Sequence, residues 1–541
     1  MTPKRKPAKG PAPPRAPKRW LWLPKAEWGV ALLLTAAAIA YHVWFFLKAG
    51  DLWRDEVNSF EFARMPLGTA FASLQHDSFP FLPTLLLHGW LAVGGGGSET
   101  AIRIFGLLVG LFLLGGLWLT ARLFRCDVPL LSLALLGLNP WVVRTVDSVR
   151  PYGIGMVLFV AALGCVWRAA ESGRRKWILL AGTLALLSVQ CMYQNALLLL
   201  ALCIAGAVVA WRGGSVRNAG AVLAVGLVAA LSLLVYRSSL AAARDWSIVN
   251  QAPVPWKALR HEFETALCAG SRVALWGWGA VAILTAAIGV HSLRRRSSLA
   301  LFAAAFALLA TLVYLVAIKG TRVPTQPWYY VPLAVAAAPA LDAALRAQAA
   351  DARRAVRLVL ALLLAGAVAV PGWNQLRERR TNMDLVASIL AKRASAGDVV
   401  VVYPFFFGVS FHRYYHGPAA WLTIPPISDL RIHRYDLLKR LMSRPQPIEP
   451  VYASVAQALR TGHKVWLVGG LPPSDPKHVP LPPPPLPNTG WYMGPYMFSW
   501  GREAAGFLES HALSAEVVDT STGEPVSHYE NASIQVLAGW H

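Results

Sequence analysis

The chain has 541 residues, of which 55% are hydrophobic and 15% are charged, with a mean hydropathy of +0.44. Soluble domains carry about 25% charged residues, so this composition excludes an ordinary soluble protein. The formal net charge of +23 does not indicate nucleic-acid binding, because nearly all of the excess lies at the ends of apolar runs. From residue 377 onward, basic and acidic residues are nearly balanced.

Twelve apolar runs dominate the first two thirds of the chain, and most of them are long enough to span a bilayer. A basic, proline-rich segment precedes them and is predicted to be a cytoplasmic tail, residues 1–27. The first run lacks a clear signal-peptide cleavage site, so we expect it to remain as a membrane anchor. The runs cover residues 28–47, 80–94, 101–121, 128–143, 151–167, 177–193, 195–211, 219–236, 272–290, 299–318, 328–345 and 357–372.

Six basic clusters between these runs predict the topology. If all six face the cytoplasm, two crossings must separate neighbouring clusters, and only the first interval breaks this rule because it holds three runs. The odd run is 80–94, which is short and contains Pro80, Pro83 and His88. We expect it to be re-entrant or to lie along the outer surface. About 11 crossings remain, residues 49–100 become one outer loop, and the C-terminus is predicted to lie outside.

The C-terminal region, residues 376–541, has a different character. Two helix-like runs, MDLVASILAKRAS and VYASVAQALRTG, are each followed by a strand-like run, GDVVVVYP and HKVWLVGG. This alternation predicts a soluble α/β domain. The predicted fold is therefore a polytopic α-helical membrane domain, residues 28–375, with outer juxtamembrane helices and a C-terminal α/β domain.

The first outer loop contains the sequence DLWRDEVNSFEFAR. At helical spacing, one face carries apolar side chains and another carries Asp51, Asp55 and Asn58. Such a helix can lie on a membrane surface with its acids toward water. The alternative is a polar loop whose acids are merely solvated.

Five motifs follow one another along residues 28–345. They are Asp55-Glu56, HDSFPFLPTLLLHGW, SETAIRIFGLLVG with its end at ARLF, LNPWVVRTVDSVRPYGIGM and TQPWYYVPLAVAAAPAL. Their order and spacing resemble the GT-C superfamily of membrane glycosyltransferases. More narrowly they resemble family 39, which includes protein O-mannosyltransferases and the aminoarabinose transferase of lipid A. The resemblance implies a GT-C-like fold and a sugar donor linked to polyprenyl phosphate.

The resemblance also implies a role for each acid of the first loop. Asp55 would be the general base, taking the proton of the acceptor hydroxyl while its oxygen attacks the anomeric carbon. Polyprenyl phosphate would leave, and direct displacement would invert that carbon. Glu56 would orient Asp55 or pair with an arginine. The alternative for Asp55 is a structural acid that caps the surface helix.

Candidates for binding the donor's phosphate and sugar lie at the outer ends of the apolar runs, since arginine pairs with phosphate in fork geometry. They are Arg150, Tyr152, Lys319, Arg322, Tyr329 and Tyr193. For the cations, the alternative is anchoring at the membrane interface. Many relatives have His-Tyr and Arg-Tyr where this chain has Met192-Tyr193 and Trp328-Tyr329-Tyr330, so we expect its acceptor-side chemistry to differ.

A divalent metal ion is the one cofactor that the resemblance suggests. In some relatives an acid of the first outer loop and a histidine of the long outer loop share such an ion. The corresponding candidates here are His76, Asp77 and His261. The alternative is a set of solvated side chains.

The predicted function is transfer of a sugar from a polyprenyl-phosphate donor to a hydroxyl of a lipid, glycan or protein. The reaction would take place at the outer face of a bacterial inner membrane, with the donor and membrane lipids as partners. A transporter or flippase of a lipid-linked saccharide is the alternative, for which inverted repeats and broken helices are typical. Neither feature is clear in the sequence.

Overall fold

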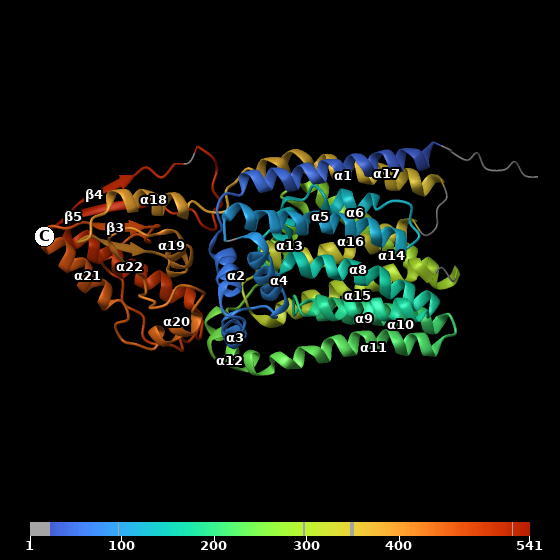
Figure 1. The fold of residues 1–541 in the computed structure, drawn as a ribbon, viewed down its shortest axis with the longest axis horizontal. Helices are drawn as coiled ribbons and strands as arrows, with labels where there is room; N and C mark the ends of the chain where they lie inside the picture. The colour runs from blue at the N-terminus through green and yellow to red at the C-terminus, as the bar shows by residue number, and fades with distance from the viewer. Residues whose placement is uncertain (1–21, 96, 296–297, 347–350, 522) are drawn as a thin grey trace, which may run out of the picture.

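The computed structural model describes residues 22–95, 97–295, 298–346, 351–521 and 523–541, so most of the predicted tail lies outside the described residues. A bundle of long helices forms one part of the molecule, and a smaller part with a β-sheet lies against one end of the bundle (Figure 1). The chain is a multi-pass membrane protein, because eight of the described helices are long and apolar enough to cross a bilayer.

The eight long helices agree with eight of the predicted crossings. They are α1 (Leu23–Lys48), α5 (Glu99–Leu123), α8 (Tyr152–Ser172), α10 (Asn195–Arg212), α11 (Val216–Ser232), α14 (Arg272–Arg295), α15 (Ser298–Thr321) and α17 (Asp351–Gln375). Two further predicted crossings correspond to shorter helices, α9 (Arg175–Val189) and α16 (Val331–Arg346).

The predicted crossing at 128–143 is not one helix. It is divided into α6 (Leu130–Leu136) and α7 (Pro140–Val146). The break arises at Asn139, whose side chain accepts the backbone N–H of Trp141 and so starts a new helix with Pro140 in its first turn. The Asn139 amide also donates to the carbonyls of Ala266 and Leu267, which fixes the break against α13 (Trp256–Cys268).

The run 80–94 forms α4 (Leu82–Trp90), which has nine residues and is followed by a π-helical turn, Leu91–Gly95. Nine residues extend about 14 Å, roughly half of the hydrocarbon thickness, so α4 is too short to cross. It packs against α2 (Arg54–Arg64) at the end of the bundle that faces the C-terminal region, where α3 (Leu67–Ala72) and α12 (Arg237–Ser247) also lie (Figure 1).

The C-terminal region contains the predicted α/β elements. The helix-like runs form α18 (Met383–Arg393) and α21 (Glu449–Arg460), and the strand-like runs form β1 (Val399–Val402) and β3 (Val465–Val468). The remaining elements are β2 (Ala420–Thr423), β4 (Ala512–Val518), β5 (Ile534–Trp540), α19 (Gly408–Tyr414), α20 (Tyr435–Met442) and α22 (Met493–His511).

The five strands form one mixed sheet in the order β2-β1-β3-β5-β4. Strand β1 runs parallel to β2 and β3, while β5 runs antiparallel to β3 and β4. Helices α18 and α19 cover one face of the sheet, and α21 and α22 cover the other. Strands β1 and β3 are therefore buried on both faces, which explains their continuous apolar sequences.

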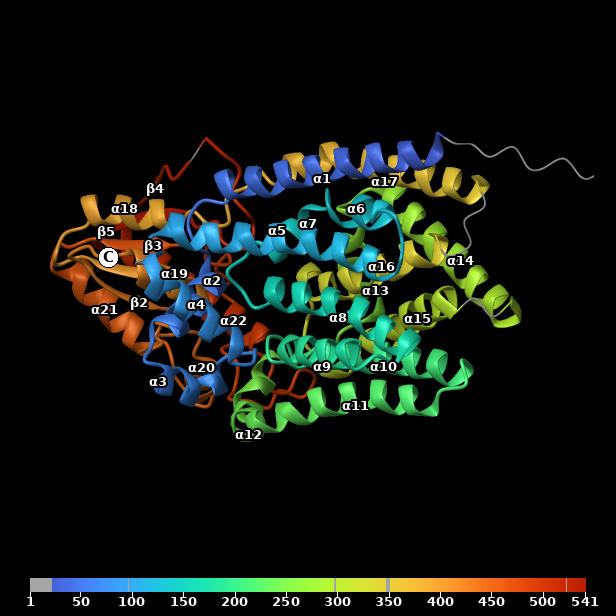
Figure 2. The same cartoon turned by 45° about the vertical axis from the view of Figure 1, so that its right-hand side comes forward.

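The C-terminal region and the outer loop share a hydrophobic core, in which Val57 and Phe60 of α2 pack together with Val401 and Phe405. Helix α19 lies directly against α2 (Figure 2). Polar contacts reinforce this junction, since Arg413 pairs with Glu99 at 2.6 Å. The sheet thus holds the first outer loop against the end of the membrane helices.

Candidate functional site

Asp55 lies in the first turn of α2. This helix begins after Trp53, whose backbone is extended. The Asp55 Oδ2 atom lies 2.9 Å from Nη1 of Arg150, and its Oδ1 atom lies 3.2 Å from Nε2 of His433. Arg54 approaches Oδ1 more loosely, at 3.8 Å. The carboxylate is thereby held between the loop before α8 and the C-terminal region.

Asp55 does not face water, as it would on the predicted surface helix. Only 18% of its side chain is exposed. Burial by itself would raise the pKa of Asp55, but the charge of Arg150 and the hydrogen bond from His433 outweigh it. The pKa therefore lies well below its usual range, and Asp55 is ionised at every pH at which the protein is expected to work. The pKa of Arg150 is raised, because the attraction of Asp55 exceeds the effect of burial.

Glu56 does not contact Asp55 but forms a separate, fully buried ion pair. Its Oε1 atom lies 2.8 Å from Arg103 of α5 and accepts the backbone N–H of Val149 at 3.3 Å. Arg103 also donates to the carbonyls of Gly50 and Asp51. This pair ties the start of the outer loop to α5 and to the segment before Arg150, so it supports the position of Asp55 indirectly.

Asp51 lies next to the Glu56–Arg103 pair, and Tyr152 lies next to Arg150 of the Asp55–Arg150 pair. Burial and the nearby acids Asp384 and Glu99 raise the pKa of Asp51 to about 6. The Arg150 guanidinium lies 5.2 Å from the Tyr152 ring centre and 5.4 Å from that of Phe79, so two aromatic rings confine it.

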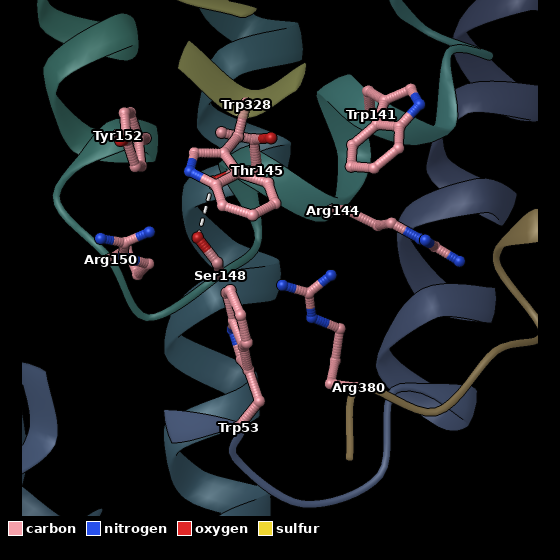
Figure 3. A pocket seen from close by; sticks show the side chains of 9 residues that line it. All are labelled: Trp53, Trp141, Arg144, Thr145, Ser148, Arg150, Tyr152, Trp328 and Arg380. Carbon is pink, nitrogen blue, oxygen red and sulfur yellow. Dashed lines mark hydrogen bonds between the residues drawn. The ribbon is translucent and has the colours of Figure 1, made fainter. Parts of the chain in front are cut away.

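A narrow pocket opens beside Arg150; its empty space is about 270 Å³ including the open mouth, of which the centre of a water-sized molecule can occupy about 10 Å³. Three tryptophans and three arginines are prominent in its lining (Figure 3): Trp53, Trp141, Trp328, Arg144, Arg150 and Arg380. Arg150 belongs both to this pocket and to the ion pair with Asp55, so the pocket adjoins the carboxylate. We call it the arginine pocket.

The arginine pocket offers more hydrogen-bond donors than it uses. The indole nitrogens of its three tryptophans and the Nε atoms of its three arginines are buried, and they find no hydrogen-bond partner among the described residues. An unpaired buried donor is costly, so a cluster of such donors indicates a site for an acceptor-rich ligand.

The three arginines differ in their charge balance. Arg150 pairs with Asp55, and Arg144 pairs with Glu378 at 2.8 Å. Arg380 is 5% exposed and has no carboxylate within 4 Å among the described residues. Burial lowers its pKa to about 10, which still leaves it charged at neutral pH. The pocket therefore carries one uncompensated positive charge, which suits a singly charged anion such as a phosphodiester.

Lys319 and Arg322, predicted as donor-phosphate ligands beside Asp55, line a different pocket. This second pocket lies between the segment 251–255 and the loop 488–491, and none of its lining residues belongs to the arginine pocket. Tyr329 follows Trp328 of the arginine pocket, and its carbonyl accepts the Tyr314 hydroxyl. Tyr193 packs edge-on against Tyr236, with ring centres 5.9 Å apart.

The metal candidates are not brought together. His76 Nδ1 lies 3.6 Å from Asp436, while Asp77 accepts the backbone N–H of Ser78. His261 lies on α13, and within the described ranges no three His, Cys, Asp or Glu side chains are close enough to share an ion. These residues do not fit the metal that the resemblance suggested, so no step of the reaction is assigned to one.

His433, Arg380, Arg144 and Arg103 were not predicted as site residues. His433 stands in the sequence RIHRYD and Arg380 in RERR, where each reads as part of a charged surface segment. The sequence feature that best indicated the site is a set of tryptophans. Trp53, Trp141 and Trp328 each stand in or within a few residues of a predicted site motif.

Part of the chain is similar to a known protein family. Residues 78–236 match the family described as "Dolichyl-phosphate-mannose-protein mannosyltransferase". No curated protein matches the chain. Two matching solved structures are ArnT from Cupriavidus metallidurans bound to undecaprenyl phosphate and the Archaeoglobus fulgidus oligosaccharyltransferase tethered to an acceptor peptide.

The ArnT structure is 16% identical with a TM-score of 0.48, and the match covers 81% of this chain and 93% of ArnT. The oligosaccharyltransferase is 11% identical with a TM-score of 0.47, and the match covers 94% and 75% of the two chains. Residues 78–236 are thus similar to the dolichyl-phosphate-mannose-protein mannosyltransferase family, and the chain is a membrane glycosyltransferase that uses a polyprenyl-phosphate sugar donor.

Proposed function

We propose that the enzyme transfers its sugar to a hydroxyl acceptor with inversion, and that Asp55 is the general base. The observation that carries this proposal is the Asp55 carboxylate, which is ionised, held from two sides and placed at the edge of the arginine pocket. The match of residues 78–236 to a mannosyltransferase family favours a transferase over the competing transporter hypothesis.

In the proposed reaction the acceptor oxygen attacks the anomeric carbon of the donor while its proton passes to Asp55. The bond from that carbon to the phosphate oxygen breaks, and its electron pair leaves with polyprenyl phosphate. Arg380, Arg144 and Arg150 stabilise the charge that develops on the leaving phosphate, so no acid catalyst is required.

Arg150 connects the two halves of this mechanism. In the structure it pairs with Asp55, which makes Asp55 a weak base. A donor phosphate in the arginine pocket competes for Arg150 and weakens that pairing, so donor binding raises the basicity of Asp55. The base is thereby strengthened when a donor is present.

The direct test compares Asp55→Asn with Glu61→Gln. Both residues lie on α2, and Glu61 pairs with Arg64 and Arg413 away from the arginine pocket. Purified protein would receive the sugar lipid that accumulates in a deletion strain, with membrane extract as the acceptor source and release of polyprenyl phosphate as the readout. Asp55→Asn should lose at least about a thousandfold in rate, while Glu61→Gln stays near wild type. Wild-type release by a folded Asp55→Asn protein would disprove the assignment.

The side of the membrane is also a proposal. The basic clusters at the ends of the apolar runs favour a cytoplasmic N-terminus, and this orientation places α2 and the C-terminal region outside, at the inner membrane of a bacterium. Alkaline phosphatase fused after His541 should be active and a fluorescent protein fused there dark. The opposite pair of results would reverse the orientation.

A further inference from the structure

The second pocket lies between the membrane helices and the C-terminal region, with about 1420 Å³ of empty space including its open mouth. Lys319 and Arg322 at the outer end of α15 form one side, and Gln251 lies nearby. Asn488, Thr489 and Trp491 of the C-terminal region form the other side. On the membrane side, the Ala252 N–H donates to the Arg322 carbonyl at 2.7 Å, which joins the segment 251–255 to the end of α15.

The second pocket has a positive charge that its own lining does not balance. None of its lining residues is acidic. Lys319 donates to the Val254 carbonyl, and neither Lys319 nor Arg322 has a carboxylate within 4 Å among the described residues. A basic, open pocket of this kind favours a ligand that carries a carboxylate or a phosphate.

The rest of the lining is typical of a carbohydrate site. Trp491 offers an aromatic face, and Gln251, Asn488 and Thr489 offer amide and hydroxyl groups that can both donate and accept hydrogen bonds. A simple anion would use only the cations, whereas a saccharide would also use these four side chains.

A series of side-chain contacts runs from the second pocket to His433. Lys439 of α20 pairs with Asp245 of α12 at 2.6 Å and lies 5.0 Å from the Trp491 ring centre. One residue further along α12, the Trp246 ring stacks on Tyr435, whose ring in turn stacks on His433. The arginine pocket, in contrast, reaches Asp55 through Arg150. Packed side chains thus link the second pocket to the partner of Asp55 Oδ1, whereas the arginine pocket contains the partner of Oδ2.

We propose that the second pocket binds the acceptor, and that this acceptor is a saccharide with an anionic substituent. The inference rests on the proposed transfer reaction, which needs a donor on one side of Asp55 and an acceptor on the other. Lys319 and Arg322 would bind the anionic group, and Trp491 would stack on the sugar ring. The two cations are thereby assigned to the acceptor and not to the donor phosphate.

Binding of defined probes to the full-length protein in detergent tests the proposal by calorimetry. Trigalacturonate carries carboxylates, glucose 6-phosphate carries a phosphate, and maltotriose and glucose are their neutral counterparts. At least one anionic saccharide should bind about tenfold more tightly than its counterpart, and the tighter of the two identifies the anion. The double variant Lys319→Gln/Arg322→Gln should remove this advantage.

Two further variants provide a control and a test of the contact between Trp491 and the sugar ring. Arg237→Gln removes an exposed charge at the start of α12, outside the pocket, and should bind the probes like wild type. Trp491→Ala should weaken the saccharides about tenfold without changing the affinity for inorganic phosphate. Equal affinity for anionic and neutral probes, no binding of either anionic saccharide, or wild-type binding by the double variant would overturn the proposal. Binding of inorganic phosphate alone would also overturn it.

A failure of the acceptor-site proposal can be distinguished from a failure of the proposed reaction. Asp55→Asn lies outside the second pocket, so it should bind the anionic saccharide with wild-type affinity. If Asp55→Asn kept its transfer activity, the base assignment would fail while the binding results stood. If the pocket variants bound normally, the acceptor site would fail while the base assignment stood.

Discussion

The imidazole of His433 lies 3.2 Å from the carboxylate of Asp55, although the two residues are 378 positions apart in the sequence. Two contacts hold His433 in place. Its backbone N–H donates to the Asn58 side chain at 2.9 Å, and its ring stacks on Tyr435. The C-terminal region therefore completes the candidate site in addition to covering it.

His433 is expected to act as a positioning residue for Asp55. His433→Ala should lower kcat by about ten- to a hundredfold, because the carboxylate loses one of its two close partners. His433→Gln should recover much of the rate, since its amide can donate to Asp55 from a similar reach. The exposed His412→Ala variant in the same region is the control. Equal losses in the Ala and Gln variants would contradict the prediction.

Arg380 is expected to be more important for donor binding than for stability. Arg380→Met removes a buried charge that has no carboxylate partner, so its Tm should equal or exceed that of wild type. The KM for the donor lipid should rise about tenfold or more. Arg380→Lys should recover part of the affinity. A lower Tm with an unchanged donor KM would show that Arg380 is structural.

The Glu56–Arg103 pair is expected to be essential for stability. Glu56→Gln leaves a buried guanidinium without its carboxylate, which costs about 3–5 kcal/mol for pairs of this kind. Thermal unfolding should show a large loss for Glu56→Gln and a smaller loss for the double variant Glu56→Gln/Arg103→Met. Additive losses in the double variant would show that the two residues are not coupled.

Asp77 is expected to destabilise the protein above pH 6. Burial raises its pKa to about 6, despite the hydrogen bond from Ser78 and the charge of Arg150. The folded protein therefore holds this proton more tightly than the unfolded chain, and stability falls as the pH rises from about 4 to 6. The cost reaches up to about 3 kcal/mol above pH 6.

The comparison of Asp77→Asn with wild type at several pH values measures this effect. Asparagine keeps an oxygen for the Ser78 N–H but carries no charge, so the variant should have the higher Tm at pH 8. Near pH 4 the difference should disappear. A constant difference at both pH values would show that the titration of Asp77 is not its cause.

The predictions made from local sequence patterns are confirmed where hydrophobic periodicity alone decides the secondary structure. The apolar runs predict the long helices, and α18, β1, α21 and β3 follow from the periodicity of the C-terminal region. The run 128–143 shows the limit, because its hydropathy is continuous although Asn139 and Pro140 begin a second helix there. At that point the helix-capping residue Asn139 divides a run that hydropathy alone predicts as one helix.

The candidate site was predictable in part. The sequence singles out both Asp55 and Arg150, and the structure brings them into contact. It also proposes both Arg150 and Arg322 as donor ligands, and the structure places these arginines in two pockets. Arg150 and Arg322 lie at the ends of apolar runs, where hydropathy does not distinguish between neighbouring positions.

By itself, the sequence determines that this is a polytopic membrane protein with an α/β region after its last apolar helix. It also determines that Asp55 and Glu56 follow the first helix, because these features depend on composition and short-range order. Only the tertiary structure decides that Asp55 meets His433, that Glu56 meets Arg103, and that Arg380 lies over the Trp53 ring with no hydrogen-bond partner for its Nε among the described residues. These contacts arise when α2 packs against α5 and against the C-terminal region, and packing between distant segments leaves no periodic signal in the chain.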